Sequence, residues 1–226
     1  MIDSIARACA RRTGLFTSPH LVDFRERIKV SGEEIPEDDC AAMLSELRVL
    51  CERMETHPTF FEITLVLAMR WFRIRECEII VLETGMGGRL DATTAVPADL
   101  CVITPIGLDH MQWLGESLEE IAAEKAGIFV PGKPAISAPQ KPEARAVLEK
   151  EANEQRTPLA FVDEPLLGYP MALAGEHQKW NAALATAALH RAGLPLNSDI
   201  VGYGLSHVTW PGRFETIRPG VVLDGA

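Results

Sequence analysis

The sequence predicts an α/β fold with a mostly parallel sheet flanked by helices. Short apolar runs alternate along the chain with longer amphipathic stretches, as strands and helices do in this fold class. The runs are continuously apolar, which is typical of parallel strands covered on both faces. With 226 residues, 47% of them apolar, the chain can bury a core without disulfides or a structural metal.

The predicted strands are short apolar runs separated by polar or glycine-containing segments. They are residues 14–17, 78–82, 100–104, 134–137 and 159–162. A further apolar run at 220–224 predicts a buried strand that ends in the acidic Asp224.

The predicted helices begin and end at recognisable residues. Pro36 suits the first turn of one helix. Ser117 and Glu120 have the spacing of a capping box, and Gly127 ends that helix. The predicted helices are residues 1–9, 36–54, 60–72, 117–126, 143–155 and 176–191.

The overall charge excludes several classes of partner. Acidic residues outnumber basic ones by 32 to 22, giving a net charge of −10. No cluster of Lys and Arg offsets it, so we expect no nucleic-acid surface and no membrane surface.

The cysteines and the N-terminal segment bear on the cellular location. The five cysteines form no CxxC pair, and no secretory signal or membrane-spanning run is present, so we expect a reduced, cytoplasmic protein. An organelle-targeting N-terminal helix stays a second interpretation, against which Asp3 and the scarcity of serine count.

A glycine-rich segment follows the strand predicted at 78–82. Glu83 stands at the carboxyl end of that strand, where open α/β sheets bind ligands. The three glycines of residues 85–88 allow close backbone approach, but a tight turn with a solvated Glu explains the pattern equally well. The next predicted strand leads to His110, so we expect Glu83 and His110 at one sheet edge as a candidate Mg²⁺ site.

Other polar positions have two interpretations each. Ser18 follows the first strand and can cap a turn or bind a ligand. Lys125 closes a helix, where a cation normally complements the helix dipole. Asn181 can contact a nucleotide or belong to a capped helix, and Arg213 can clamp a phosphate or lie in a surface turn. The charged segment 23–29 is expected to be a solvated face.

One apparent motif is rejected. Residues 127–133 match the spacing G-x-x-x-x-G-K of a phosphate loop. Such a loop needs a strand before it and a hydroxyl residue and a helix after it. Here a helix precedes and Pro134 follows, so the segment is interpreted as a turn.

Ordered segments together carry a family resemblance over nearly the whole chain. They include SPHLVDFRERI at 18–28, LETGMGGRLDATT at 82–94, DHMQWLG at 109–115 and GEHQKWN at 175–181. The remaining segments are 60–62, 121–127, 210–215 and 224–226. In these segments the chain resembles the folylpolyglutamate synthases and dihydrofolate synthases of the Mur ligase superfamily, which implies their P-loop NTPase-like central domain.

The resemblance implies a role for each matching position. Ser18, Glu83 and His110 match residues that hold magnesium near the nucleotide phosphates. Lys125 matches a lysine that is carbamylated and binds a second metal ion, and Lys125 and His110 are the implied catalytic residues. The implied nucleotide contacts are Asn181, Arg213 and Asp224. The implied substrate contacts are Phe61, Glu62, Asp91 and Ala92.

The resemblance implies an amide-forming reaction. ATP would phosphorylate a carboxylate of folate or dihydropteroate, and the amine of L-glutamate would attack the acyl phosphate. The implied cofactors are ATP and Mg²⁺, the implied partners are these small molecules, and the complete protein is expected to be a monomer. Phosphoryl transfer mainly requires positioning and charge neutralisation, which the candidate residues suit.

The resemblance also predicts the domain organisation. Residues 1–208 match the central ATP-binding domain without its first strand and phosphate loop, and 209–226 match the start of a C-terminal ligase domain. We therefore expect a truncated chain that is inactive alone. Two alternatives stay open: a non-catalytic remnant that binds a pteridine or a metal, and another Mur-type ligase that acts on a peptide.

Overall fold

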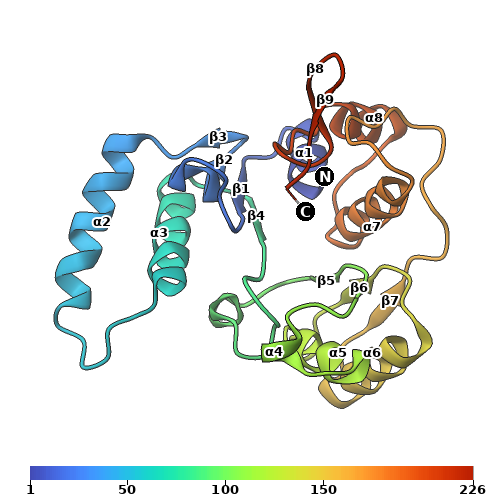
Figure 1. Ribbon diagram of the computed structural model, residues 1–226, viewed down its shortest axis with the longest axis horizontal. Coiled ribbons are helices and arrows are strands. Elements are labelled where there is room, and N and C mark those ends of the chain that lie inside the picture. The colour runs from blue at the N-terminus through green and yellow to red at the C-terminus, as the bar shows by residue number, and fades with distance from the viewer. Residues whose placement is uncertain (226) are drawn as a thin grey trace.

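Strand β1 lies inside a four-stranded sheet in the computed structural model, which describes residues 1–225 (Figure 1). Its neighbours are the parallel strand β4 on one side and the antiparallel strand β2 on the other, and β3 pairs with β2. The bounds are β1 Thr13–Phe16, β2 Ile28–Val30, β3 Glu33–Glu34 and β4 Ile79–Leu82. The strands predicted at 14–17 and 78–82 are thus confirmed.

The segment 23–29 differs from its prediction as a solvated face. Arg27 and Ile28 are buried, and β2 starts at Ile28 and pairs antiparallel with β1. The physical reason is that Ile28 and Val30 point into the core shared with β1, while the intervening Lys29 is only partly buried.

A second sheet contains three parallel strands. They are β5 Cys101–Ile103, β6 Ala135–Ser137 and β7 Leu159–Phe161, in that order. All three agree with predicted strands. Within the described residues, β4 and β5 are not hydrogen-bonded neighbours, so the expectation that their ends adjoin in one sheet is wrong.

A hairpin of β8 (Glu215–Arg218) and β9 (Val221–Leu223) forms a third, antiparallel sheet. The prediction of a buried strand at 220–224 is wrong in its burial. Val222 and Leu223 are 45% and 48% exposed, because β8 is the only strand of the described chain that pairs with β9.

The predicted helices are all present, with small shifts at their ends. The helices are α1 Ile2–Ala8, α2 Glu37–Cys51, α3 Phe60–Ile74, α4 Met111–Leu114, α5 Leu118–Ala126, α6 Pro142–Gln155, α7 His177–Arg191 and α8 Ser198–Ser206. The structure adds two helices, α4 and α8, that the sequence analysis did not predict. The side chain of Asn197 caps α8 by accepting the backbone N–H of Ile200 at 2.8 Å. In the described part of the chain, no helix is both long and apolar enough to cross a membrane.

Helices cover both faces of the β1–β4 pair. A Cβ added to Gly14 would lie 2.7 Å from the Phe72 ring, so α3 packs directly on one face of β1. On the opposite face, the Thr13 hydroxyl donates to Asp3 of α1 at 2.5 Å. Figure 1 shows α2 and α3 on one side of the sheet and α1 on the other.

Helix α7 packs between the mixed sheet of β1–β4 and the parallel sheet of β5–β7. Ala182 and Ala185 pack with Ile5 of α1, whereas Leu184 packs against Ile136 of β6. Because α1 lies on the first sheet, α7 holds both sheets in one layered arrangement. The carboxyl ends of the parallel strands then carry the loops described next.

Candidate active site

The loops that follow β1 and β4 leave the sheet side by side. The two strands are parallel and in register, with Phe16 opposite Leu82. The backbone N–H of Glu83 donates to the carbonyl oxygen of Phe16 at 2.9 Å. The backbone N–H of Ser18 in turn donates to Oε2 of Glu83 at 2.7 Å. The structure therefore places Ser18 directly beside Glu83.

Glu83 has the electrostatic surroundings of a ligand-binding carboxylate. Desolvation by the surrounding protein raises its pKa, although its side chain retains access to solvent. The Ser18 amide and the positive charges of Arg213 and Arg27 lower the same pKa and partly offset this effect. Among residues 1–225, only one of its two oxygens accepts a hydrogen bond. A carboxylate oxygen with free lone pairs suits Mg²⁺, which prefers few protein oxygens together with water and phosphate oxygens.

Arg27 is a site residue that the sequence reasoning missed. It is 8% exposed, and its Nε–H donates to Nδ1 of His20 at 2.8 Å. Its guanidinium lies over the Phe60 ring, 5.3 Å from the ring centroid. The available signal was its position just before the alternating residues of β2, which places it at the sheet rather than on a solvated face.

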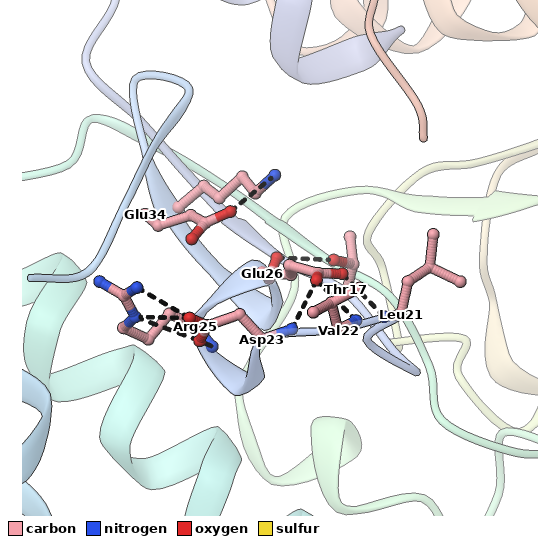
Figure 2. Close-up of polar contacts among 8 residues, drawn as sticks. Thr17, Leu21, Val22, Asp23, Arg25, Glu26 and Glu34 are labelled. Atoms are coloured by element: carbon pink, nitrogen blue, oxygen red, sulfur yellow. Dashed lines mark hydrogen bonds and ion pairs between the residues drawn. The ribbon is translucent and has the colours of Figure 1, made fainter. Parts of the chain in front are cut away.

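The Ser18 loop, defined as residues 17–23, is closed by the side chain of Glu26 (Figure 2). The Glu26 carboxylate accepts the backbone N–H groups of Leu21, Val22 and Asp23. Asp23 itself pairs with Arg25, and this hydrogen-bonded pair lowers the pKa of Asp23 to about 2. Charged side chains thus hold the Ser18 loop, and Ser18 at its start lies next to Glu83.

The glycine loop, defined as residues 84–91, is organised by Asp91. One oxygen of Asp91 accepts the backbone N–H groups of Gly85 and Met86, at 2.9 and 3.0 Å. The other accepts the backbone N–H and the hydroxyl of Thr93. A Cβ on Gly85 would lie 2.8 Å from the Phe61 ring, so Phe61 and Asp91 meet at this loop.

Of the two further predicted substrate contacts, Ala92 directly follows the glycine loop and Glu62 belongs to the cap of α3. Ala92 follows Asp91 in the short 3-10 helix Ala92–Ala95 and packs against the same core as Phe61. The carboxylate of Glu62 accepts the backbone N–H of Thr59 at 2.6 Å and completes the capping box of α3. This hydrogen bond lowers the pKa of Glu62.

The glycine loop packs on the end of α5, which carries Lys125. A Cβ on Gly88 would lie 2.6 Å from the carbonyl oxygen of Glu124 and 2.8 Å from that of Lys125. The backbone N–H of Arg89 donates to the same Glu124 carbonyl at 2.9 Å. Lys125 is half-buried, and no ion pair within the described chain involves it. Its predicted carbamylation stays a prediction.

His110 lies in the turn between β5 and α4. Its backbone is left-handed, with φ of 51°, and its side chain is 53% exposed. Its nearest ion-pair partner is Asp109, at 3.7 Å. Over residues 1–225, no hydrogen bond or ion pair joins His110 to Glu83 or Lys125, and no cluster of three or more His, Cys, Asp or Glu residues has metal-binding geometry. Its role as a metal ligand therefore stays a prediction.

The predicted nucleotide contacts are dispersed. Asn181 lies in the second turn of α7, where its amide donates to Gln178 at 3.0 Å. Arg213 lies in the turn before β8, close enough to Glu83 to affect its pKa. Asp224 is exposed directly after β9. Of these three, the structure brings Arg213 to the Ser18 and Glu83 loops.

These observations define an α/β domain whose strand-end loops gather acidic and basic groups at one edge, as ligand-binding α/β domains do. The chain belongs to the Mur ligase middle domain family, whose sequence model matches residues 35–157.

Similar proteins and solved structures extend the comparison. An Escherichia coli dihydrofolate synthase/folylpolyglutamate synthase is 37% identical over 243 residues, which cover 100% of this chain and 56% of that protein. The apo form of L. casei FPGS superimposes with a TM-score of 0.93 at 27% identity and is covered to 63%. E. coli FolC in complex with DHPP and ADP superimposes with a TM-score of 0.89 at 35% identity and is covered to 57%. The chain thus spans little more than half the length of these relatives.

Proposed function

We propose that this chain is the nucleotide-binding part of an ATP-dependent carboxylate–amine ligase that adds L-glutamate to folate or dihydropteroate. The observation that carries the proposal is the convergence of Ser18, Glu83 and Arg213 at one strand edge. The relatives named above support the choice of substrates, since their names include folylpolyglutamate synthase and dihydrofolate synthase. The solved complex of E. coli FolC with DHPP and ADP supports ATP as the phosphoryl donor.

In this proposal the γ-phosphoryl group of ATP passes to a substrate carboxylate and ADP leaves. The L-glutamate amine then attacks the acyl phosphate, so that a C–N bond forms, a proton is lost and inorganic phosphate departs. Glu83 and Ser18 would hold Mg²⁺, with His110 and Lys125 as further ligands. When bound, the metal neutralises phosphate oxygens during transfer. Arg213 adds a cation that can pair with two phosphate oxygens at once.

The glycine loop is the proposed contact for the pteridine ring. Phe61 supplies an aromatic face beside Gly85, and Asp91 holds the loop backbone in shape. Asn181 and Asp224 remain proposed nucleotide contacts, and Glu62 and Ala92 remain proposed neighbours of the substrate. We further propose that Lys125 is carbamylated and that the complete protein acts in the cytoplasm as a monomer.

Binding and ligation measured together test the proposal. Purified chain is titrated with Mg²⁺-ADP and with dihydropteroate by calorimetry, and glutamate ligation by the complete protein is assayed with folate, dihydropteroate and a cell-wall precursor side by side. The variant Glu83→Gln is compared with Glu164→Gln, an exposed position outside the site. We expect Mg²⁺-ADP binding to weaken only in Glu83→Gln, by about tenfold or more. Ligation restricted to the cell-wall precursor, or equal binding by both variants, would overturn the proposal.

A separate test addresses Lys125. We expect Lys125→Ala to abolish ligation in the complete protein and small carboxylates such as acetate to restore part of it. The carbamate should also appear as a carbonyl signal in the ¹³C NMR spectrum of protein supplied with labelled CO₂. Full activity of Lys125→Ala would refute the carbamate role.

A further inference from the structure

Glu26 gathers three consecutive backbone amides of the Ser18 loop. Oε2 accepts the N–H of Leu21 at 2.8 Å, and Oε1 accepts those of Val22 and Asp23 at 2.8 and 2.7 Å. Figure 2 shows the carboxylate facing this stretch of backbone. Hydrogen bonds to a carboxylate are charge-assisted and stronger than those between neutral groups. Their effect is visible in Glu26 itself, whose pKa they lower.

A local helix cap explains only part of this arrangement. Asp23 and Glu26 form a capping box for the 3-10 helix Phe24–Arg27, and that box requires the Asp23 N–H alone. The N–H groups of Leu21 and Val22 lie outside the helix, in the loop that leads back to Ser18. No other acceptor in the described chain bonds to them. Two of the three hydrogen bonds therefore serve the loop rather than the helix.

Apolar burial does not hold this part of the loop in place. Leu21 is 57% exposed and Val22 is 90% exposed. A segment with exposed side chains and few apolar contacts opens easily unless hydrogen bonds restrain it. The Glu26 carboxylate therefore restrains residues 21–23, while the Arg27–His20 and Ser18–Glu83 hydrogen bonds restrain the start of the loop.

The loop is also connected to both charged groups of the candidate site. At its start, the Ser18 N–H donates to Glu83 at 2.7 Å. At its tip, Leu21 packs against Gly212, where an added Cβ would lie 3.0 Å from the Leu21 side chain. Gly212 precedes Arg213, whose charge affects Glu83. A displaced loop would consequently disturb Ser18, Glu83 and Arg213 together.

We infer that Glu26 is a positioning residue, whose carboxylate holds the Ser18 loop so that Ser18 stays bound to Glu83. Glu26 acts through the loop backbone and touches no substrate in this role. The consequence for metal binding rests on the proposed function, in which Ser18 and Glu83 hold Mg²⁺. The claim that Glu26 restrains the Ser18 loop depends only on the observed hydrogen bonds.

Amide hydrogen exchange in the full 226-residue chain tests the positioning role. Glu26→Ala is compared with Glu33→Ala, an exposed glutamate on β3, and Glu26→Gln is included because it keeps the shape of the side chain. We expect exchange at Leu21, Val22 and Ser18 to rise by about tenfold or more in Glu26→Ala and to rise less in Glu26→Gln. Amides within β1 and β4 should keep their rates in every variant. Unchanged exchange at Ser18 in both Glu26 variants would overturn the inference.

Measuring metal affinity distinguishes a failure of this inference from a failure of the proposed function. Mn²⁺ affinity is measured by electron paramagnetic resonance for the same variants, with the metal alone as the probe. We expect affinity to fall by about tenfold in Glu26→Ala and to be partly rescued in Glu26→Asp, with Glu33→Ala unchanged. Faster exchange with undiminished Mn²⁺ affinity would overturn the link to the metal site. If the unmodified chain binds no Mn²⁺, the proposed function fails, while the exchange rates still decide whether Glu26 holds the loop.

Discussion

Replacing Gly88 with alanine tests how closely the glycine loop must approach α5. The added Cβ would lie 2.6 Å from the carbonyl oxygen of Glu124 and 2.8 Å from that of Lys125. Ordinary contacts of a Cβ begin at 3.4 Å, so the loop or the helix must shift by more than half an ångström. Both obstructing atoms belong to the backbone of a helix and cannot rotate away. The shift must therefore disturb the packing of the loop on α5.

The expected cost follows from this overlap. Forcing extra volume into a packed region typically costs about 1–3 kcal/mol. In a chain of this length, each kcal/mol lowers Tm by about 2–4 °C. We therefore expect Gly88→Ala to lose about 2 kcal/mol of unfolding free energy and about 4–8 °C in Tm.

Calorimetric melting curves provide the assay, and Gly107→Ala provides the matched control. A Cβ on Gly107 meets nothing within 4 Å, and its φ lies outside the left-handed region. This control should melt at the Tm of the unmodified chain or slightly higher, since alanine restricts the unfolded chain. The Arg89 amide, which donates to Glu124, should exchange faster in Gly88→Ala alone. Equal Tm values for the two variants would refute the reasoning.

Three further predictions concern the loops and the core. Asp23 should remain ionised down to pH about 2. Because its pKa is depressed from the ordinary 3.8, its favourable contribution to folding is complete above 3.8 and is lost as the pH falls through about 2. Carboxyl ¹³C NMR should show this titration, and Arg25→Gln should move it upward. His20 should be the neutral tautomer protonated at Nε2, since Nδ1 accepts the Arg27 N–H, and ¹⁵N NMR of the ring should show it. Leu148→Ala should cost about 2–5 kcal/mol in urea unfolding, because Leu148 of α6 is fully buried in the core that α6 shares with α5.

Each of these predictions has a contrary result. An Asp23 titration that Arg25→Gln leaves in place would show that the pair does not set the pKa. A His20 ring with its proton on Nδ1 would exclude the Arg27 hydrogen bond in solution, and Arg27→Leu should remove the tautomer preference. A loss below about 1 kcal/mol in Leu148→Ala would mean that the site relaxes around the cavity.

Local signals were sufficient for most of the fold. The parallel strands are apolar runs, and the capping box of Ser117 and Glu120 starts α5 where predicted. The missed elements have weak local signals: β2 spans three residues, and α8 follows a polar turn at Asn197. The segment 23–29 was misjudged because charged residues outnumber the apolar Ile28, which is buried where the chain pairs with β1.

The sequence by itself determined the alternation of strands and helices, the strand-end positions of Ser18 and Glu83, and the glycine loop beside them. These features depend on side-chain period, capping and turn residues, which act over a few positions in the chain. Only the tertiary structure decided that β4, which leads to Glu83, and β5, which leads to His110, belong to different hydrogen-bonded sheets. Only the tertiary structure brought Arg27 into a hydrogen bond with His20 and turned the Glu26 carboxylate toward the Ser18 loop. The physical reason is that sheet order and buried hydrogen bonds are decided by packing between distant segments, which no local pattern encodes.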